Sequence, residues 1–516
     1  MSLEAVSEEV KEEKWFQTNH LQGDLKARSV RGGVSTMAAQ IFSFVMNIAQ
    51  STIMARLLVP EDYGLIAMVA SITGFITLFK DLGLSSAVIQ KEKLTQSEVS
   101  SVFWVNVLIS LGIALFVALL APGIVYFYEE DRLLLITLVF ALNIFIMGLS
   151  LQHNALMKRQ MRFKSLALIQ LTAVGTNVIA GIILAWLGFG YWALVIQGLI
   201  FSVLQTGALW LLCDWRPDLA FKKANVGSFL KFGAGVTGFD VVNHFSRNMD
   251  NVFIGKFVST VALGLYSKAY QLLMLPITQL RNPLNSVAIP ALSSLQNDGA
   301  KFRNFYSRYL FILAFFSMPI VVYLGVFAEE LIIMVLGEQW KEAGYLFQLL
   351  AIAAFIQPVA STPGIILITT GSVKRYFNIG LVNAICMVSG FAIGVFTGGV
   401  SGVAIAQAVV VYTLFLPVLY YSLHKTPVSV ALYLKEISLP ATFSLISGVA
   451  MAVYAYYMSQ LSLHLSPMYY AVYCACGFIV GAVVYIGLMI IFPTSRKKFK
   501  QILDIGSFMK KGKTAK

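Results

Sequence analysis

The chain has 516 residues, of which 58% are hydrophobic and only 12% are charged, whereas a typical soluble domain carries roughly 25% charged residues. This composition, with a mean hydropathy of +0.76, excludes a soluble enzyme, a disordered chain and a disulfide-rich scaffold, because the surplus apolar side chains need lipid to face. The net charge of +13 indicates membrane topology rather than a nucleic-acid partner, since Lys and Arg collect in the cytoplasmic loops of membrane proteins.

The first 32 residues form a polar segment that we expect to be a cytoplasmic leader. Several glutamates make it acidic. It lacks the basic start and the apolar stretch that define a signal peptide. Within it, we expect a short surface helix around Trp15 and Phe16.

Apolar stretches follow the leader along almost the whole chain. A helix that crosses a bilayer needs about 20 predominantly apolar residues, and about fourteen stretches satisfy this length. They show no alternating strand pattern, so we predict an all-α polytopic membrane protein. The predicted spans are 34–58, 63–82, 99–125, 132–157, 165–187, 190–213, 229–257, 262–290, 307–336, 342–371, 376–397, 400–423, 432–458 and 466–492.

The basic residues predict the topology of these spans. Most of the 38 Lys and Arg residues fall in segments on the same side as the leader. The loops on the opposite side carry only Arg56, Arg132, Lys256 and Lys341. Such a bias predicts that both termini are cytoplasmic.

An internal repeat is visible when residue n is set against residue n+200. Arg56 and the Gly64-Leu65 pair then fall on Lys256 and the Gly264-Leu265 pair. Polar positions on the first and seventh spans also correspond, and their steps of three and four place them on one face of each helix. We therefore predict two parallel repeats related by an axis along the membrane normal. The matched positions are Thr36, Gln40, Ser43, Asn47 and Gln50 against Val236, Asp240, Asn243, Arg247 and Asp250.

The repeat predicts two six-helix lobes with pseudo-two-fold symmetry, followed by two further helices. The longest polar stretch between spans lies at 214–228, and we interpret it as the linker between the lobes. The expected organisation is a leader at 1–32, an N-terminal lobe at 33–213, the linker at 214–228, a C-terminal lobe at 229–424, two helices within 425–492 and a basic cytoplasmic tail at 493–516.

Ionisable residues inside the predicted spans are the strongest functional signal. Each costs at least about 2.5–3.5 kcal/mol at the bilayer centre, so function is the default interpretation. They are Asp240, His244, Arg247, Asp250, Lys268 and Arg281.

Asp250 and Lys268 lie at similar predicted depths, and form either a structural ion pair or a functional one, in which Asp250 takes part in gating or ion coupling and Lys268 binds substrate. Arg247 and Arg281 have no acidic residue at matching depth in their own hairpin, which favours an anion-binding cavity, since arginine binds phosphate oxygens bidentately. His244 is either a packing residue or, with Asp240, a group that couples to an ion. Asn47 and Gln50 either contact substrate or form hydrogen bonds between helices.

Motifs for enzyme chemistry are absent from the sequence. It contains no GxxxxGK[ST] loop and no HExxH motif, and its four cysteines lie in apolar stretches without metal-ligand spacing. We therefore predict no catalytic residue, no cofactor and no metal site.

Several short segments resemble the polysaccharide-transporter branch of the MOP exporter superfamily, the Wzx-type flippases of lipid-linked oligosaccharides. The resemblance covers roughly residues 30 to 490. The segments that carry it are Ala55–Leu58, Asp62–Leu65, Asp81–Gly83, Ile89–Gln90, Asp250–Val252, Ala262–Tyr266, Ala269–Tyr270 and Pro290–Ser293.

This resemblance implies that the protein moves an undecaprenyl-pyrophosphate-linked repeat unit from the inner to the outer leaflet of the bacterial cytoplasmic membrane. Its expected partners are the lipid-linked oligosaccharide, membrane lipids, a polysaccharide polymerase and a chain-length regulator. Related lipid II flippases use arginines on their first, second and eighth helices, and Arg281 matches the last of these. The first helix here has only its neutral polar face, so that part of the correspondence fails.

Two other functions remain open. A multidrug or cation antiporter of the same fold needs acidic cavity residues, whereas this cavity is expected to be basic. A membrane polysaccharide polymerase needs a large outer loop, and the sequence contains none.

Overall fold

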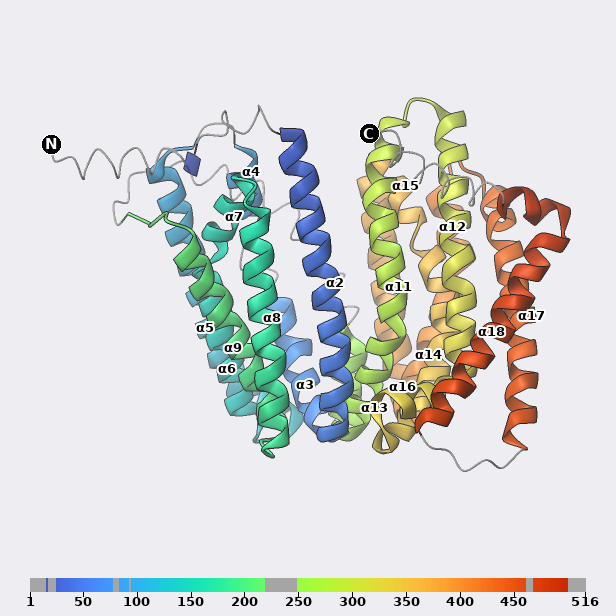
Figure 1. The fold of residues 1–516 in the computed structure, drawn as a ribbon, viewed down its shortest axis with the longest axis horizontal. Helices are drawn as coiled ribbons and strands as arrows, with labels where there is room; N and C mark the ends of the chain where they lie inside the picture. The colour runs from blue at the N-terminus through green and yellow to red at the C-terminus, as the bar shows by residue number, and fades with distance from the viewer. Residues whose placement is uncertain are drawn as a thin grey trace. The chain divides into compact units, whose positions relative to one another are not determined.

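The computed structural model describes residues 15–16, 25–77, 83–91, 94–218, 248–460 and 467–499. All regular structure in these ranges is helical (Figure 1). The chain divides into two compact units, Met1–Gly264 and Leu265–Lys516.

The first unit is a bundle of long apolar helices. Helix α2 packs against α8, α5 against α6, and α9 against both α6 and α8. Its described helices are α2 (Leu25–Leu57), α3 (Pro60–Thr77), α4 (Leu84–Gln90), α5 (Gln96–Tyr128), α6 (Leu133–Gly148), α7 (Leu151–Arg159), α8 (Phe163–Trp186) and α9 (Tyr191–Leu212), with a helical stretch at 248–257 and the first turn of α11.

Local sequence sets where α5 begins and ends. Thr95 and Glu98 form a capping box at its start, in which each side chain accepts a hydrogen bond from the other residue's backbone N–H. These bonds satisfy donors that a helix N-terminus otherwise leaves without partners. The helix ends at Glu129, whose φ of 59° lies in the left-handed region.

The predicted span 132–157 is divided into two helices, α6 and α7, at Leu149–Ser150. Side chains of α9 compensate for the break: Thr206 Oγ1 donates to the Ile146 carbonyl at 3.1 Å, and Trp210 Nε1 donates to the Leu149 carbonyl at 2.9 Å. Backbone groups inside a bilayer need such internal partners. These two hydrogen bonds from α9 therefore help to stabilise the break.

The second unit is also a helical bundle. Helix α12 packs against α14 and α17, α14 against α16, and α17 against α18. Its helices are α11 (Thr260–Ser294, which begins in the first unit), α12 (Gly299–Val326), α13 (Ala328–Leu336), the short 3-10 helix η2 (Glu338–Trp340), α14 (Lys341–Ala360), α15 (Pro363–Thr369), α16 (Val373–Leu423), α17 (Val430–Ser459) and α18 (Pro467–Ile491), followed by a helical turn at 493–499.

Buried tyrosines connect the helices of this unit. The hydroxyls of Tyr306 and Thr362 lie 2.7 Å apart, and the Tyr433 hydroxyl donates to the Val359 carbonyl at 2.6 Å. Both tyrosine side chains are fully buried. They hydrogen-bond to the α14–α15 junction, where the predicted span 342–371 is broken.

The predicted helices correspond well to the structure, with differences at their joints. The predicted span 307–336 is divided at Phe327, whereas the predicted boundary between 376–397 and 400–423 is confirmed inside α16, where Gly398 and Gly399 have non-helical backbone angles. Most of the seventh span lies outside the described residues. Within the described part of the chain, ten helices are long and apolar enough to cross a membrane. The all-α polytopic fold is therefore confirmed.

Candidate functional site

The polar face of α2 is partly used for packing inside the first unit. Gln50 Nε2 donates to Gln197 Oε1 on α9 at 2.6 Å, and Gln170 Nε2 on α8 donates to Ser43 Oγ at 3.2 Å. Asn47, between them on the same face, is exposed. Gln50 thus makes the interhelical hydrogen bond that was one of its two interpretations, while Asn47 remains a candidate for contact with substrate.

Asp250 lies near the start of the described part of the seventh span, 248–257. Its side chain is only 5% exposed, and its Oδ1 accepts a hydrogen bond from the Asn251 backbone N–H at 2.8 Å. Lys268 on α11 is 6% exposed. Asp250 belongs to the first unit and Lys268 to the second, so their pairing stays a prediction.

Arg281 lies on α11, half-buried and within electrostatic range of Tyr309 on α12. The Tyr309 hydroxyl donates to Asn285 Oδ1 at 2.6 Å. Asn285 follows Arg281 by one helical turn, so both residues share a face. The predictions did not include Tyr309 and Asn285, although the four-residue step from Arg281 to Asn285 was a usable signal.

The other predicted site residues, Asp240, His244 and Arg247, lie outside the described residues.

Two glycines of the predicted repeat meet at a close helix crossing. A Cβ atom on Gly64 would lie 1.9 Å from the Thr260 carbonyl oxygen, and a Cβ atom on Gly264 would lie 1.8 Å from the Pro60 carbonyl oxygen. Gly264 lies 200 residues after Gly64, and Thr260 lies 200 residues after Pro60. The two contacts therefore join equivalent positions of the predicted repeat. Such reciprocity defines a two-fold contact, and it supports an internal duplication.

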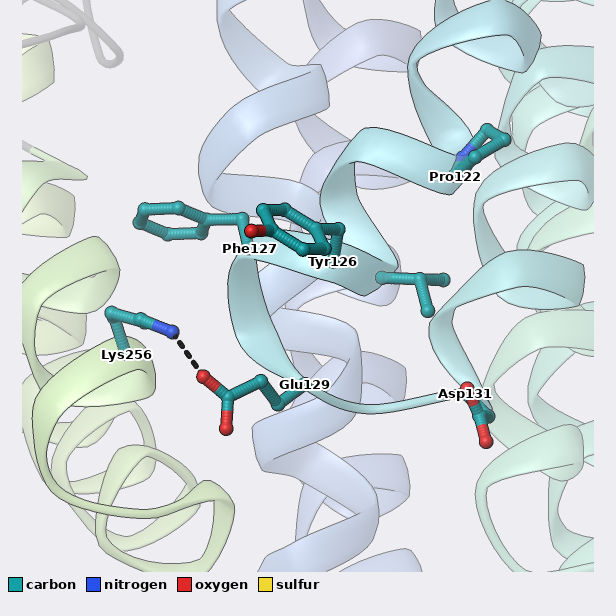
Figure 2. A pocket seen from close by; sticks show the side chains of 7 residues that line it. Pro122, Tyr126, Phe127, Glu129, Asp131 and Lys256 are labelled. Atoms are coloured by element: carbon teal, nitrogen blue, oxygen red, sulfur yellow. Dashed lines mark hydrogen bonds and ion pairs between the residues drawn. The ribbon is translucent and has the colours of Figure 1, made fainter.

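Lys256, which precedes Thr260 by four residues in the sequence, forms an ion pair in the first unit. Lys256 Nζ is 2.8 Å from Glu129 Oε1 and 5.6 Å from the centre of the Phe127 ring. Figure 2 shows the lysine reaching from its helix to the carboxylate that follows α5. The ammonium group lowers the pKa of Glu129, which accepts its hydrogen bond.

A pocket of about 700 Å³ surrounds this pair. Tyr126 on its wall is 86% exposed, as is usual for aromatic side chains where a membrane meets water. The pocket therefore marks one end of the transmembrane bundle. It is lined by Pro122, Val125, Tyr126, Phe127, Glu129, Asp131 and Lys256.

A second ion cluster connects α3 to the turn after α5. Arg132 donates to Glu61 at 2.5 Å and to Glu130 at 2.7 Å. Hydrogen bonding to Arg132 lowers the pKa of Glu130, and both carboxylates raise the pKa of Arg132. Burial raises the pKa of the neighbouring Asp62, which accepts a hydrogen bond from the Val59 N–H.

These contacts hold helix ends together; they provide no nucleophile paired with a base. No group of three or more His, Cys, Asp or Glu side chains with metal-binding geometry occurs among the described residues.

Comparison with known proteins identifies the family. A sequence model of the polysaccharide biosynthesis protein family matches residues 53–345. The chain belongs to this family. The resemblance to its flippase branch is confirmed by relatives that include the lipopolysaccharide biosynthesis protein WzxC of Escherichia coli (strain K12), 23% identical over 388 residues, which is 74% of this chain and 78% of WzxC.

Another relative is the teichuronic acid biosynthesis protein TuaB of Bacillus subtilis (strain 168). It is 25% identical over 483 residues, which is 90% of this chain and 95% of TuaB. This alignment covers more of the chain than the family match does.

Solved structures show the same fold. The lipid II flippase MurJ in an inward closed conformation superposes with a TM-score of 0.71 at 17% identity, covering 89% of this chain and 98% of MurJ. An inward-facing MATE-family multidrug transporter of the MOP superfamily gives 0.57 at 15% identity, covering 75% and 97%. The family member described here therefore has a MOP-type fold.

Proposed function

We propose that this protein is a flippase that moves an undecaprenyl-pyrophosphate-linked oligosaccharide repeat unit from the inner to the outer leaflet of the cytoplasmic membrane. The observation that carries the proposal is the family match over residues 53–345, in a chain whose fold is that of a lipid II flippase. Relatives named for lipopolysaccharide and teichuronic acid biosynthesis support a role in polysaccharide export.

The physical task explains why the charged residues of α11 matter. A pyrophosphate carries negative charges that cannot cross about 30 Å of hydrocarbon unaided. Arg281 and Lys268 provide cations within a predicted span, and Arg247 belongs to the same proposed set. In this proposal Asn47 contacts the substrate from α2, beside the Gln50–Gln197 hydrogen bond, whereas Asp250, with His244 and Asp240, takes part in gating or ion coupling.

The proposed location is the bacterial inner membrane with both termini in the cytoplasm. In that orientation, the ion pairs of Arg132 and Lys256 lie on the outer side. The product would pass from there to a polysaccharide polymerase and its chain-length regulator.

The direct test follows lipid-linked oligosaccharide in proteoliposomes by its accessibility to an impermeant reagent. Arg281→Ala should abolish flipping while the protein stays folded. Arg281→Lys should keep part of the activity, because it retains the charge but loses the planar guanidinium. Arg303→Ala, which changes an exposed arginine on α12, is the matched control. Normal flipping by Arg281→Ala would exclude the proposed role of this residue.

A second test addresses Asp250 and Lys268. Removing one partner of a buried pair leaves an uncompensated charge, at a cost of about 3–5 kcal/mol. The double exchange Asp250→Lys with Lys268→Asp should therefore recover more flipping than either single change. A double variant as inactive as both single variants would argue against the pair.

The MATE-like fold keeps one alternative under consideration, namely a multidrug or cation antiporter. The same proteoliposomes separate the two functions. Drug-driven cation exchange without any movement of lipid-linked sugar would replace the flippase proposal.

A further inference from the structure

The second unit contains a small basic pocket at the end of its last two long helices. The pocket has a volume of about 370 Å³ and lies between the start of α17 and the helical turn that follows α18. Because α17 and α18 are membrane-spanning helices, their ends reach the level of lipid headgroups. It is lined by Leu432, Lys435, Glu436, Pro493, Thr494, Lys497 and Lys498.

The turn that carries two of these lysines is fixed to the body of the unit. The Phe492 ring packs on the Phe443 ring, with 5.2 Å between ring centres. The Phe499 ring packs on the Phe315 ring, with 5.8 Å between ring centres. Ser495 Oγ donates to the carbonyls of Met489 and Phe492, both at 3.0 Å. The lysines between these anchors are therefore presented by a packed segment.

The charge of the pocket is net positive. Glu436, 8% exposed, pairs with Lys498 at 2.6 Å, and the same ammonium lies 5.1 Å from the centre of the Phe311 ring. Lys435 and Lys497 are exposed, and neither makes an ion pair with a carboxylate in the described part of the chain. Two cations thus remain available to an anion.

Apolar surface adjoins the cations. Ile490, Ile491 and Phe492 are 46%, 72% and 47% exposed at the end of α18. A ligand that satisfies both surfaces has an anionic head and an apolar tail. Basic pockets between spanning helices commonly bind the headgroups of anionic lipids.

We propose that this pocket binds the phosphate headgroup of an anionic phospholipid from the surrounding bilayer, whose acyl chains cover the end of α18. Lys435 and Lys497 contact the phosphate, and Thr494 donates a hydroxyl hydrogen bond to it. The site is independent of the transported substrate, so it holds whether or not the flippase proposal is correct.

The test uses the full-length protein in nanodiscs of phosphatidylcholine with increasing phosphatidylglycerol, and native mass spectrometry counts the bound lipid. The double variant Lys435→Gln with Lys497→Gln should weaken phosphatidylglycerol binding roughly thirtyfold, since each surface cation contributes about fivefold. Arg303→Gln, which removes an exposed charge elsewhere on the unit, should leave binding unchanged. Equal binding by the double variant and the wild type would overturn the proposal.

Glu436→Gln gives a change in the opposite direction. It releases the Lys498 ammonium from its ion pair and raises the net charge of the pocket, so phosphatidylglycerol should bind several-fold more tightly. A purely structural role for the Lys498–Glu436 pair predicts a lower melting temperature without this gain. Weaker or unchanged lipid binding by Glu436→Gln would therefore contradict the site.

Competition distinguishes the source of the phosphate. Undecaprenyl pyrophosphate and inorganic pyrophosphate are each added to nanodiscs that contain phosphatidylglycerol. The proposal expects neither to displace the phospholipid at equimolar concentration. Displacement by the lipid pyrophosphate would assign the pocket to the transported substrate, and displacement by inorganic pyrophosphate would assign it to a soluble anion; either result overturns the proposal.

Discussion

Arg132 and Arg159, both in the first unit, are stabilised in opposite ways. Arg132 pairs with two carboxylates at a helix end and its side chain is 38% exposed. Arg159 is only 6% exposed; its Nη1 donates to the carbonyls of Val88, Ile89 and Lys91, and its Nη2 to that of Phe16. Arg132 thus neutralises carboxylates in a solvent-exposed region, and Arg159 connects backbone segments in a buried one.

This difference shows that charge count is a poor guide to importance in this fold. The carbonyls at the end of α4 have no further helical partners, and Arg159 supplies donors to several of them at once. The guanidinium also holds Phe16, while Gln160 Nε2 donates to the Trp15 carbonyl at 2.8 Å and Arg162 stacks 4.2 Å from the centre of the Trp15 ring. Trp15 and Phe16 are thus buried, whereas the sequence predicted a surface helix.

The largest effect is expected when the buried arginine is changed. Arg159→Met keeps the apolar stem but leaves several buried carbonyls without a donor, each at a cost of about 1–3 kcal/mol. We expect a loss of roughly 3 kcal/mol or more in unfolding free energy, measured by thermal denaturation in detergent. Arg159→Lys should recover only part of it, because one ammonium cannot reach all four carbonyls. Equal stability of Arg159→Met and the wild type would mean that these hydrogen bonds do not matter.

A smaller effect is expected when Trp15, the buried tryptophan of the leader, is changed. Trp15→Ala removes a nearly buried indole and its contact with Arg162, which should cost about 2–4 kcal/mol if the docking is fully coupled to folding. Limited proteolysis of the N-terminus gives a local readout, since cleavage before residue 25 should accelerate. The exposed Trp186 on α8, 75% accessible, provides the control Trp186→Ala. Equal proteolysis rates in the two variants would show that Trp15 does not hold the leader against the first unit.

The exposed arginine should matter least for stability at neutral pH. Arg132→Gln removes two partly exposed ion pairs, each contributing about 0.2–1 kcal/mol. The difference from the wild type should shrink as salt rises from 0.05 to about 1 M, because the Debye length falls to about 3 Å. A stability loss that does not respond to salt would place Arg132 in the same class as Arg159.

The smallest expected effect is the pH dependence of stability, which also distinguishes the two regions. The pKa of Glu130 is lowered in the folded protein, so its ionised form contributes stability above its unfolded pKa of about 4.5. That contribution is lost as the pH falls through the folded value. Glu130→Gln should therefore be slightly less stable than the wild type at pH 7, and the gap should narrow as the pH falls below the unfolded pKa of about 4.5. Melting temperatures between pH 3.5 and 7 give this curve; a gap that widens in acid would reverse the assignment.

Much of this fold was predictable because hydropathy reports the length of an apolar stretch directly. The positions of α5, α8, α9 and α17 follow from their sequences alone. The break at Gly398 and Gly399 was also predicted, but the α6–α7 break was not, because Thr206 and Trp210, which hydrogen-bond to it, lie about 60 residues away. Hydropathy contains no information about such partners.

The candidate site was less predictable for the same reason. The polar face of α2 was visible in the sequence, but the partner of Gln50 is Gln197, 147 residues later. Arg159 looked like one more basic residue near a cytoplasmic loop, since its acceptors are carbonyls that every residue has. Gly64 and Gly264, by contrast, could be paired from the sequence, because the predicted repeat sets them 200 residues apart.

The crossing at Gly64 and Gly264 has a consequence for the ancestry of the chain. A reciprocal contact needs one glycine from each half, so a half-length polypeptide with a single glycine at this position would meet an identical copy in the same way. In the present chain each of the two glycines is constrained separately, because each faces a backbone carbonyl oxygen of the other segment. A side chain at either position would collide with the backbone of the other segment, so a substitution of one glycine cannot be relieved by a substitution of the other.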